Sequence, residues 1–213
     1  MPVLFKENLS PILEFPNLQV VPNKPKTLFH VVQWMDAHHA TFLRQFHELR
    51  KQVFIDDLGW DLASHDGMEW DQYDSPQAVN ILTEEGGRCV GGCRLIRSDM
   101  GHKVGEIEYS YMLRDAFRGL FREIPSSVIS HAPVSEEEWE MTRAISGRDP
   151  RQFKELLNAA GDYVRSQGGK YCLFISRPSC LRLGAIWGYE IEALGPITKI
   201  GNSDWLAVRC KVA

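Results

Sequence analysis

The sequence predicts a single α/β domain in which helices flank a mixed β-sheet. Apolar segments with the two-residue period of strands alternate with segments of helical period, and a sheet covered by helices accommodates that order. The 213 residues are enough for one domain with a substantial core. The hydrophobic content of 44% is typical of a folded globular protein rather than of a disordered chain.

The predicted domain begins with a strand and a long helix. Residues 27–32 (TLFHVV) predict the strand. Over residues 33–55 apolar side chains recur at helical spacing, which predicts a helix that packs on the core and ends by Gly59. The apolar stripe consists of Trp34, His38, Phe42, Phe46, Leu49 and Val53.

The rest of the chain continues the alternation. After an irregular acidic loop over residues 61–75, segments 78–85 and 88–98 flank a Gly-Gly turn and predict an antiparallel hairpin. The later elements are a short helix over 112–121, a strand over 139–146 (WEMTRAIS), a helix over 150–166, a buried strand over 170–176 (KYCLFIS), a helix near 179–187, and strands over 189–195 and 204–212.

The first 26 residues differ from the rest in composition. They contain five of the eleven prolines, which lack a backbone donor and restrict the preceding residue. We therefore expect residues 1–26 to form an extended N-terminal extension, and residues 27–213 to form the domain.

Composition excludes several classes of function. A formal net charge of −4 argues against binding nucleic acid, which depends on neutralising phosphates. Apolar runs are too short to span a bilayer, and the N-terminus lacks the apolar core of a signal peptide. The five cysteines include no C-x-x-C pair, which favours free thiols in the reducing cytoplasm. The histidines lack the spacing of zinc ligands, so we expect no metal site.

A set of charged and aromatic residues lies at the edges of the apolar segments. They are Arg50, Phe54, Trp60, Asp71, Asp74, Arg94, Glu140 and Arg143. Arginines, carboxylates and an indole together suit a ligand that carries a cation, a carboxylate and a flat ring. Buried ion pairs between arginine and aspartate are the structural alternative for any one of them.

Around these residues the chain resembles the acyl-homoserine-lactone synthases, the autoinducer synthases of bacterial quorum sensing. The similar segments are LRKQVFIDDLGWDL, EWDQYDSPQAVNIL, VGGCRLI and EMTRAIS, with a weaker likeness in LGPITKIGNSDWLAV. The resemblance implies an acetyltransferase-like (GNAT) fold, in which two central parallel strands splay apart and hold a pantetheine arm. WEMTRAIS and KYCLFIS stand where those strands are expected.

The resemblance also implies an acyltransferase. Enzymes of this family join S-adenosylmethionine, a substrate rather than a cofactor, to an acyl chain carried by acyl carrier protein or by coenzyme A. The amine attacks the thioester, and lactone closure then expels methylthioadenosine.

The matching residues have chemically reasonable roles in binding S-adenosylmethionine. Trp60 and Phe54 can cover the adenine or face the sulfonium, because aromatic faces attract cations. Asp71 and Asp74 can pair with the ammonium or hold the arginines in place. An arginine fork suits the substrate carboxylate, so Arg50, Arg94 and Arg143 are candidate binding residues.

The acylation step needs a base, and Glu140 is the candidate because it lies on a strand that borders the expected cleft. In a regular strand Arg143 would point to the opposite face from Glu140, so a bulge is needed to bring both into the site. Phe174 and Ser176 share one face of KYCLFIS and are the candidate acyl pocket, whereas Leu173 and Ile175 face the other way.

The chain departs from the family after the hairpin. It has LIRSDMGHKVGEIEYSYML where a Leu-Leu-Pro-Thr-like stretch is common, and Thr-Arg-Ala where Ser-Arg-Phe is usual. An acidic carrier protein would need a positive surface, for which the candidates are Arg151, Lys154, Arg165, Lys170 and Arg182. Two other functions remain open: a GNAT-type N-acyltransferase that uses acyl-CoA on another amine, and a non-catalytic ligand-binding relative.

Overall fold

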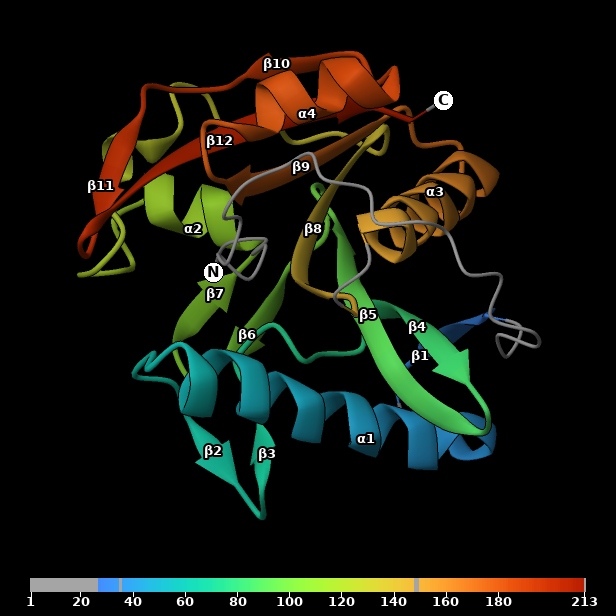
Figure 1. Ribbon diagram of the computed structural model, residues 1–213. Helices are drawn as coiled ribbons and strands as arrows, with labels where there is room; N and C mark the ends of the chain where they lie inside the picture. Colours follow the sequence, from blue (N-terminus) through green and yellow to red (C-terminus); the bar gives the residue numbers. More distant parts are fainter. Residues whose placement is uncertain (1–26, 35, 148–149, 213) are drawn as a thin grey trace.

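A computed structural model describes residues 27–34, 36–147 and 150–212, so the expected N-terminal extension lies outside the described residues. Eight strands form the main sheet, in the order β1-β4-β5-β8-β9-β12-β10 with β11 paired to β12 (Figure 1). Their bounds are β1 Leu28–Gln33, β4 Val79–Glu85, β5 Arg88–Arg97, β8 Glu138–Ile145, β9 Tyr171–Ser176, β10 Ile191–Ala193, β11 Thr198–Ile200 and β12 Ser203–Lys211. The β8–β9 pair is parallel, and the other pairs of this sheet are antiparallel.

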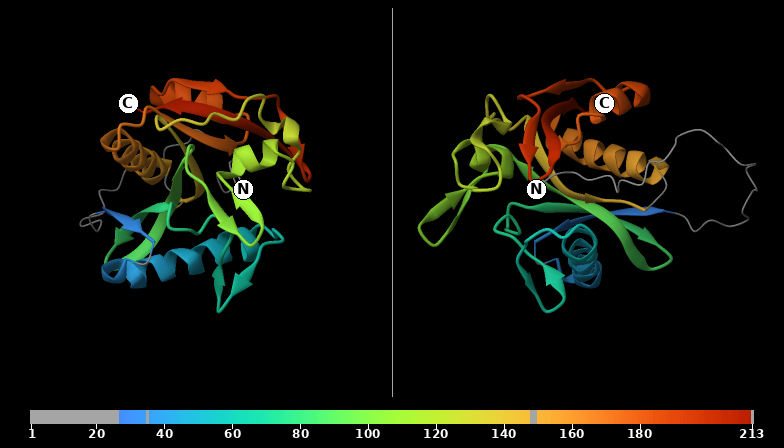
Figure 2. Two further views of the ribbon diagram at one scale, coloured as in Figure 1. Left: turned by 180° about the vertical axis from the view of Figure 1, so that it is seen from behind. Right: turned by 60° about the vertical axis from the view of Figure 1, so that its left-hand side comes forward.

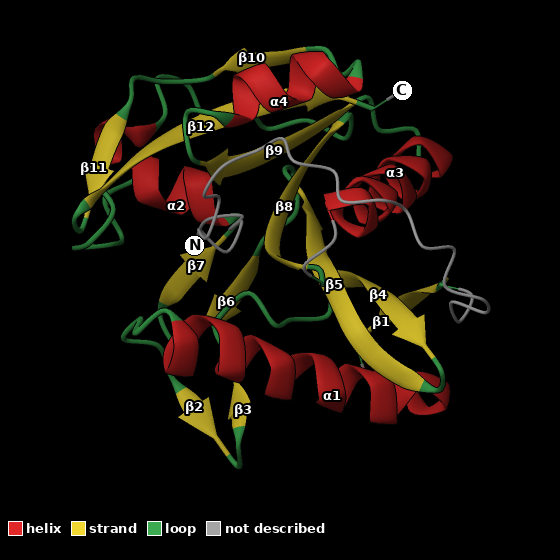
Figure 3. Ribbon diagram, viewed as in Figure 1, coloured by secondary structure: helices red, strands yellow, loops and turns green. Residues whose placement is uncertain are grey.

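Helices cover both faces of this sheet (Figure 3). Their bounds are α1 Ala40–Arg50, which continues as a π-helix over Lys51–Asp57, α2 Met112–Phe117, α3 Pro150–Ser166 and α4 Cys180–Trp187, with 3₁₀ turns at Ala37–His39 and Ser126–Val128. The α3 and α4 side chains share a core with Cys172 and Phe174 of β9. The α2 side chains instead share a core with Leu173 and Ile175. Since neighbouring strand residues point to opposite faces, α2 lies on the face opposite α3 and α4.

The predicted mixed sheet with splayed central strands is confirmed. The parallel strands β8 and β9 are paired from Glu138 as far as Glu140, which lies opposite Leu173. Beyond that pair β8 continues alongside β5 as far as Ile145, and β9 continues alongside β12 as far as Ser176. The two strands therefore form a fork that opens toward their carboxyl ends, with unpaired backbone edges on both arms.

Two details of the predicted helices are wrong. The helical region begins at Ala37 rather than at residue 33, because the Asp36 carboxylate accepts the His38 N–H and caps the first turn. His38 is consequently exposed and is not part of a buried stripe. The short helix ends at Phe117 rather than at residue 121, because Gly119 adopts a left-handed conformation with φ of 76°.

Three short strand features escaped prediction. The acidic loop contains a small hairpin, β2 Ser64–His65 with β3 Met68–Glu69. A second hairpin, β6 His102–Val104 with β7 Ile107–Tyr109, extends away from the main sheet (Figure 2). Together with β11, these strands have two or three residues each, which is too short for an apolar period to appear.

Candidate active site

Three arginines and three carboxylates form a closed ring of ion pairs below the arms of the fork. Around the ring, Glu69 pairs with Arg50 (2.5 Å), Arg50 with Asp74 (2.8 Å), Asp74 with Arg94 (2.8 Å), Arg94 with Asp71 (2.6 Å), Asp71 with Arg143 (2.7 Å) and Arg143 with Glu69 (2.6 Å). Each arginine touches two carboxylates and each carboxylate touches two arginines. The buried charges therefore balance, which is the condition for burying them at all.

The members of the ring come from two helix and strand ends, two central strands and one shared loop. Arg50 ends α1, Arg94 lies in β5 and Arg143 in β8. The aspartates are held by their own loop, in which the Asp71 carboxylate accepts the Tyr73 N–H and the Asp74 carboxylate accepts the Asp71 N–H. The structure thus brings together the predicted arginines and aspartates.

The remaining carboxylate, Glu69, was missed by the sequence analysis. It is the last residue of β3 and is fully buried. Its backbone oxygen accepts a 2.8 Å hydrogen bond from His47 Nδ1, and the His47 ring stacks on Trp70 at 3.7 Å. Burial lowers the pKa of His47 to about 4, which keeps the imidazole neutral. A count of charges gave no signal for Glu69, because Asp71, Asp74 and Glu140 already balanced the three arginines of the predicted set.

Shifted pKa values favour the charged forms of the two aspartates and of Arg50 and Arg94. Burial by itself would raise the pKa of Asp74, but Arg50 and Arg94 outweigh it and lower that pKa to about 2. Burial opposes the charge of Arg94, yet Asp71 and Asp74 raise its pKa. The side chain of Asp71 is 13% exposed, against 4% or less for the others, so Asp71 is the member closest to solvent. The carboxylates of the two aspartates form ion pairs with all three arginines and so fix the positions of the guanidinium groups.

Arg143 occupies a strained position in β8. Its φ of 53° lies in the left-handed region, and two residues of β8, Arg143 and Ala144, oppose one residue of β5, Cys93, between the pairs Gly92–Ile145 and Arg94–Thr142. A β-bulge at this position is what the sequence analysis required if Arg143 was to point to the same side of β8 as Glu140. It turns the Arg143 side chain toward the ring, where Nε and Nη2 are occupied by the carboxylates.

The other terminal nitrogen of Arg143, Nη1, is buried and has no hydrogen-bond partner among the described residues. Its guanidinium carbon lies 5.4 Å from the centre of the Phe54 ring. Phe54 in turn stacks on Trp60 with ring centres 5.1 Å apart. Phe54 is fully buried and Trp60 is half-buried, so the aromatic pair connects the ring of charges to the edge of the site.

Glu140 lies at the last paired position of the fork but outside the ring. Its two carboxylate oxygens accept the N–H groups of Met112 and Leu113, each at 2.7 Å, and so cap the start of α2. Burial raises the pKa of Glu140 to about 7 despite these two hydrogen bonds. A base with that pKa is suited to proton transfer near neutral pH, and the role itself stays a prediction.

The raised pKa of Glu140 predicts a specific dependence of stability on pH. The folded pKa of about 7 exceeds the ordinary value of 4.5, so the folded state binds the proton more tightly. The associated stability is present in full below pH ~4.5 and is lost as the pH rises through ~7, by about 3 kcal/mol at most. We expect urea unfolding to show this loss in the wild type and not in Glu140→Gln. An equal slope in both proteins between pH 5 and 8 would remove Glu140 as its source.

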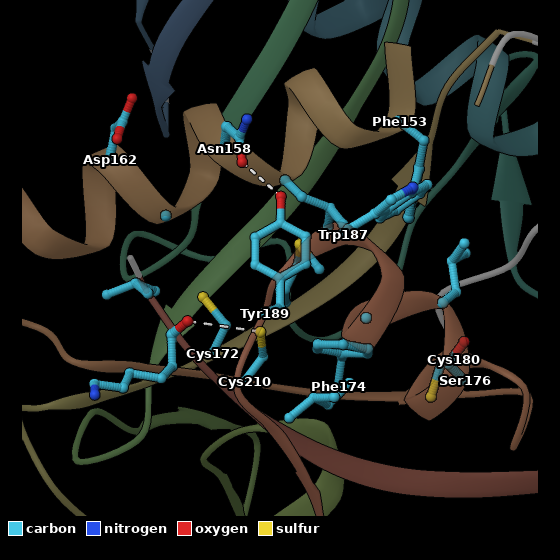
Figure 4. Close-up of a pocket in the computed structure, with 18 of the residues that line it drawn as sticks. Phe153, Asn158, Asp162, Cys172, Phe174, Ser176, Cys180, Trp187, Tyr189 and Cys210 are labelled. Atoms are coloured by element: carbon cyan, nitrogen blue, oxygen red, sulfur yellow. Dashed lines mark hydrogen bonds between the residues drawn. The ribbon is translucent and has the colours of Figure 1, made fainter. Parts of the chain in front are cut away.

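An apolar cavity of about 310 Å³ lies on the opposite face of the sheet, beneath α3 and α4 (Figure 4). Phe174 and Ser176, the predicted acyl-pocket residues, both line it. Met141 lines it from β8, one position beyond the last β8–β9 pair. Leu173 and Ile175 belong to the core of the other face, which confirms the predicted alternation. The cavity therefore begins at the fork.

No three His, Cys, Asp or Glu side chains in the described ranges are placed to hold a metal ion. The five cysteines are free thiols. Within those same ranges, no helix combines the length and apolarity that crossing a bilayer requires.

The chain is similar to proteins of one family. The family model described as autoinducer synthase matches residues 35–149. An acyl-homoserine-lactone synthase from Aeromonas salmonicida is 32% identical over 165 residues, which cover 71% of this chain and 70% of that protein. One from Rhizobium radiobacter is 38% identical over 76 residues, 36% of each chain. BjaI, a CoA-dependent acyl-homoserine lactone synthase solved with MTA, aligns with a TM-score of 0.73 at 24% identity, over 88% of this chain and 84% of BjaI; it is also solved with SAM and isopentyl-CoA.

Proposed function

This chain belongs to the autoinducer synthase family, and we propose that its β8–β9 fork is the place where S-adenosylmethionine meets an acyl thioester. The enzyme is an acyltransferase that makes an N-acyl-homoserine lactone, and we propose residues 27–213 as its catalytic domain. The assignment of the site rests on one observation. The fork has a ring of charges on one face and an apolar cavity on the other, which matches a polar and an apolar substrate.

S-adenosylmethionine is assigned to the face of the ring. Its carboxylate suits Arg143 Nη1, the buried donor that has no partner within the described residues. Its adenine and sulfonium suit the Phe54–Trp60 stack, because the half-buried indole offers a face to a flat or cationic group. Arg50, Arg94, Asp71 and Asp74 are assigned the role of fixing Arg143 and the loop.

The acyl thioester is assigned to the fork, with its tail in the cavity. Unpaired backbone groups on the two arms suit the amides of a pantetheine arm. Among the basic residues considered for an acidic carrier protein, Arg165 pairs with Asp162 and Lys170 pairs with Glu137, so neither contributes net positive charge. We assign acyl-CoA as the donor because BjaI, which this chain resembles, is a CoA-dependent acyl-homoserine lactone synthase.

The reaction balances without a cofactor. The neutral amine nitrogen bonds to the thioester carbon, the carbon–sulfur bond breaks, the sulfur leaves as a thiolate that takes a proton from water, and the nitrogen loses one proton. Glu140 is the assigned acceptor of that proton; no arginine in the described ranges forms an ion pair with it, and each of its oxygens keeps a second lone pair. The substrate carboxylate then attacks the carbon next to the sulfonium, and methylthioadenosine departs as the lactone closes.

A direct assay tests this function. Purified protein is incubated with S-adenosylmethionine and a panel of acyl-CoA donors, and released methylthioadenosine is measured by chromatography. We expect release that depends on both substrates. Absence of release with every donor, including acyl carrier protein, together with acylation of a different amine, would overturn the proposal in favour of another N-acyltransferase.

A further inference from the structure

We propose that the cavity beneath α3 and α4 is a ruler that selects an apolar, medium-length acyl chain of about eight to ten carbons, with Gly161 at its far end. This inference rests on the proposed function, because it concerns the acyl donor of the same site. It is carried by the position, the length and the lining of the cavity.

The cavity runs along β9, away from the fork. It meets the fork at Met141 and Phe174, the first residues beyond the last β8–β9 pair, and Ser176 lines it farther toward the end of β9. Its far end is at Lys211, which lies opposite Tyr171 of β9, and at the adjacent Val212. A chain held by its thioester carbon at the level of Phe174 therefore extends over three residue steps of β9 to reach the level of Tyr171.

Two estimates of the length of the chain agree. Three residues of strand span about 10 Å. An extended backbone advances roughly 1.1–1.2 Å per bond, so ~10 Å holds about eight or nine carbon–carbon bonds. The volume of about 310 Å³ is about twice that of an engineered cavity that binds the six carbons of benzene, which sets an upper limit of about twelve carbons.

The walls require an apolar tail. A row of aromatic rings closes the gap between α3 and α4: Phe153 lies beside Trp187, and Trp187 lies edge-on to Tyr189 (Figure 4). The Tyr189 hydroxyl donates to Asn158 Oδ1 of α3 at 2.5 Å, which fixes this row in place.

The charged groups at the far rim already have partners. Asp162 pairs with Arg165 at 2.7 Å, and Lys211 pairs with Glu190 at 2.9 Å. A tail that ended in a carboxylate would have to compete with these ion pairs, whereas a methyl end needs no polar partner. The lining thus selects a hydrocarbon end.

Gly161 sets the end of the ruler because it has no side chain. A Cβ placed there would contact Val212 at 3.7 Å, an ordinary distance, so a larger residue can enter without displacing backbone. Leucine also has a higher helix propensity than glycine, so Gly161→Leu should not weaken α3. The new side chain would fill the far part of the cavity.

The test compares chain-length profiles of the wild type and three variants. Methylthioadenosine release is measured with saturated acyl-CoA donors of 4 to 14 carbons. We expect a wild-type optimum at about eight to ten carbons, a shift to four to six in Gly161→Leu, and a shift of one or two carbons upward in Val212→Ala. Glu155→Leu, which adds the same side chain on the exposed side of α3, should keep the wild-type profile.

A binding measurement separates this inference from the proposed function. Thermal stabilisation by unreactive acyl-pantetheine thioethers of 4 to 14 carbons reports the cavity without turnover. The same preferences and the same shifts would support the ruler even if no donor released methylthioadenosine. A flat profile, or an optimum that Gly161→Leu and Val212→Ala both leave unchanged, would overturn the ruler whether or not the enzyme turns over.

Discussion

Replacing Glu69 with alanine is expected to lower the free energy of unfolding by about 3–5 kcal/mol, because it leaves Arg50 and Arg143 buried with one carboxylate partner fewer. Removing one partner of a buried pair costs far more than the pair itself contributes, since the uncompensated charge cannot reach water. Urea unfolding of the wild type and of Glu69→Ala measures the difference.

The matched control is Glu48→Ala. Glu48 pairs with Arg44 on α1, but both side chains are largely exposed, at 44% and 64%. Exposed pairs contribute about 0–1 kcal/mol, so this variant should unfold close to the wild type. A Glu69→Ala protein that is no less stable than Glu48→Ala would show that the ring is not a closed, buried unit.

Replacing Arg143 with lysine is expected to lower kcat/KM for S-adenosylmethionine by one to two orders of magnitude. Lysine keeps the positive charge but lacks the planar fork, so it cannot hold Glu69 and also present a second nitrogen to the substrate. A hydrogen bond to a charged group contributes about 1.5–3 kcal/mol, which corresponds to this loss. Steady-state methylthioadenosine release at varied S-adenosylmethionine measures it.

Arg97→Lys controls for the chemical change itself. Arg97 lies at the end of β5 and pairs with Asp99, with 29% of its side chain exposed. We expect kinetics close to the wild type. Thermal melting of both variants separates a loss of binding from a loss of fold. Wild-type kinetics in a folded Arg143→Lys protein would remove Arg143 from the substrate site.

The long elements of this fold could be predicted because they bury a regular apolar face. Helix α3 has buried side chains at helical spacing, and β8 and β9 are almost continuously buried, as expected of central parallel strands. The short hairpins could not be predicted, because partners and turns determine them rather than periodicity. The start of α1 was misplaced because a local cap at Asp36 prevailed over the apolar pattern.

The sequence named most residues of the candidate site, but it did not predict how they are arranged. The residue types pointed to arginine–carboxylate pairs, but only the three-dimensional structure closes them into a ring and adds Glu69. The bulge at Arg143 was needed for a shared site, yet nothing local in the sequence requires a left-handed arginine. The contact of Glu140 with α2 could not be predicted either, since it joins residues that are 27 or more positions apart in the chain.

The fork also bears on how the finished molecule departs. In the proposed binding mode, the product would have its polar head on one side of the sheet and its hydrocarbon part on the other, so its departure would require the tail to pass back between the two strands. Each methylene withdrawn into water costs about 0.8 kcal/mol, roughly a fourfold slowing of escape per carbon. We therefore expect dissociation, rather than bond making, to limit turnover for the longest chains that fit.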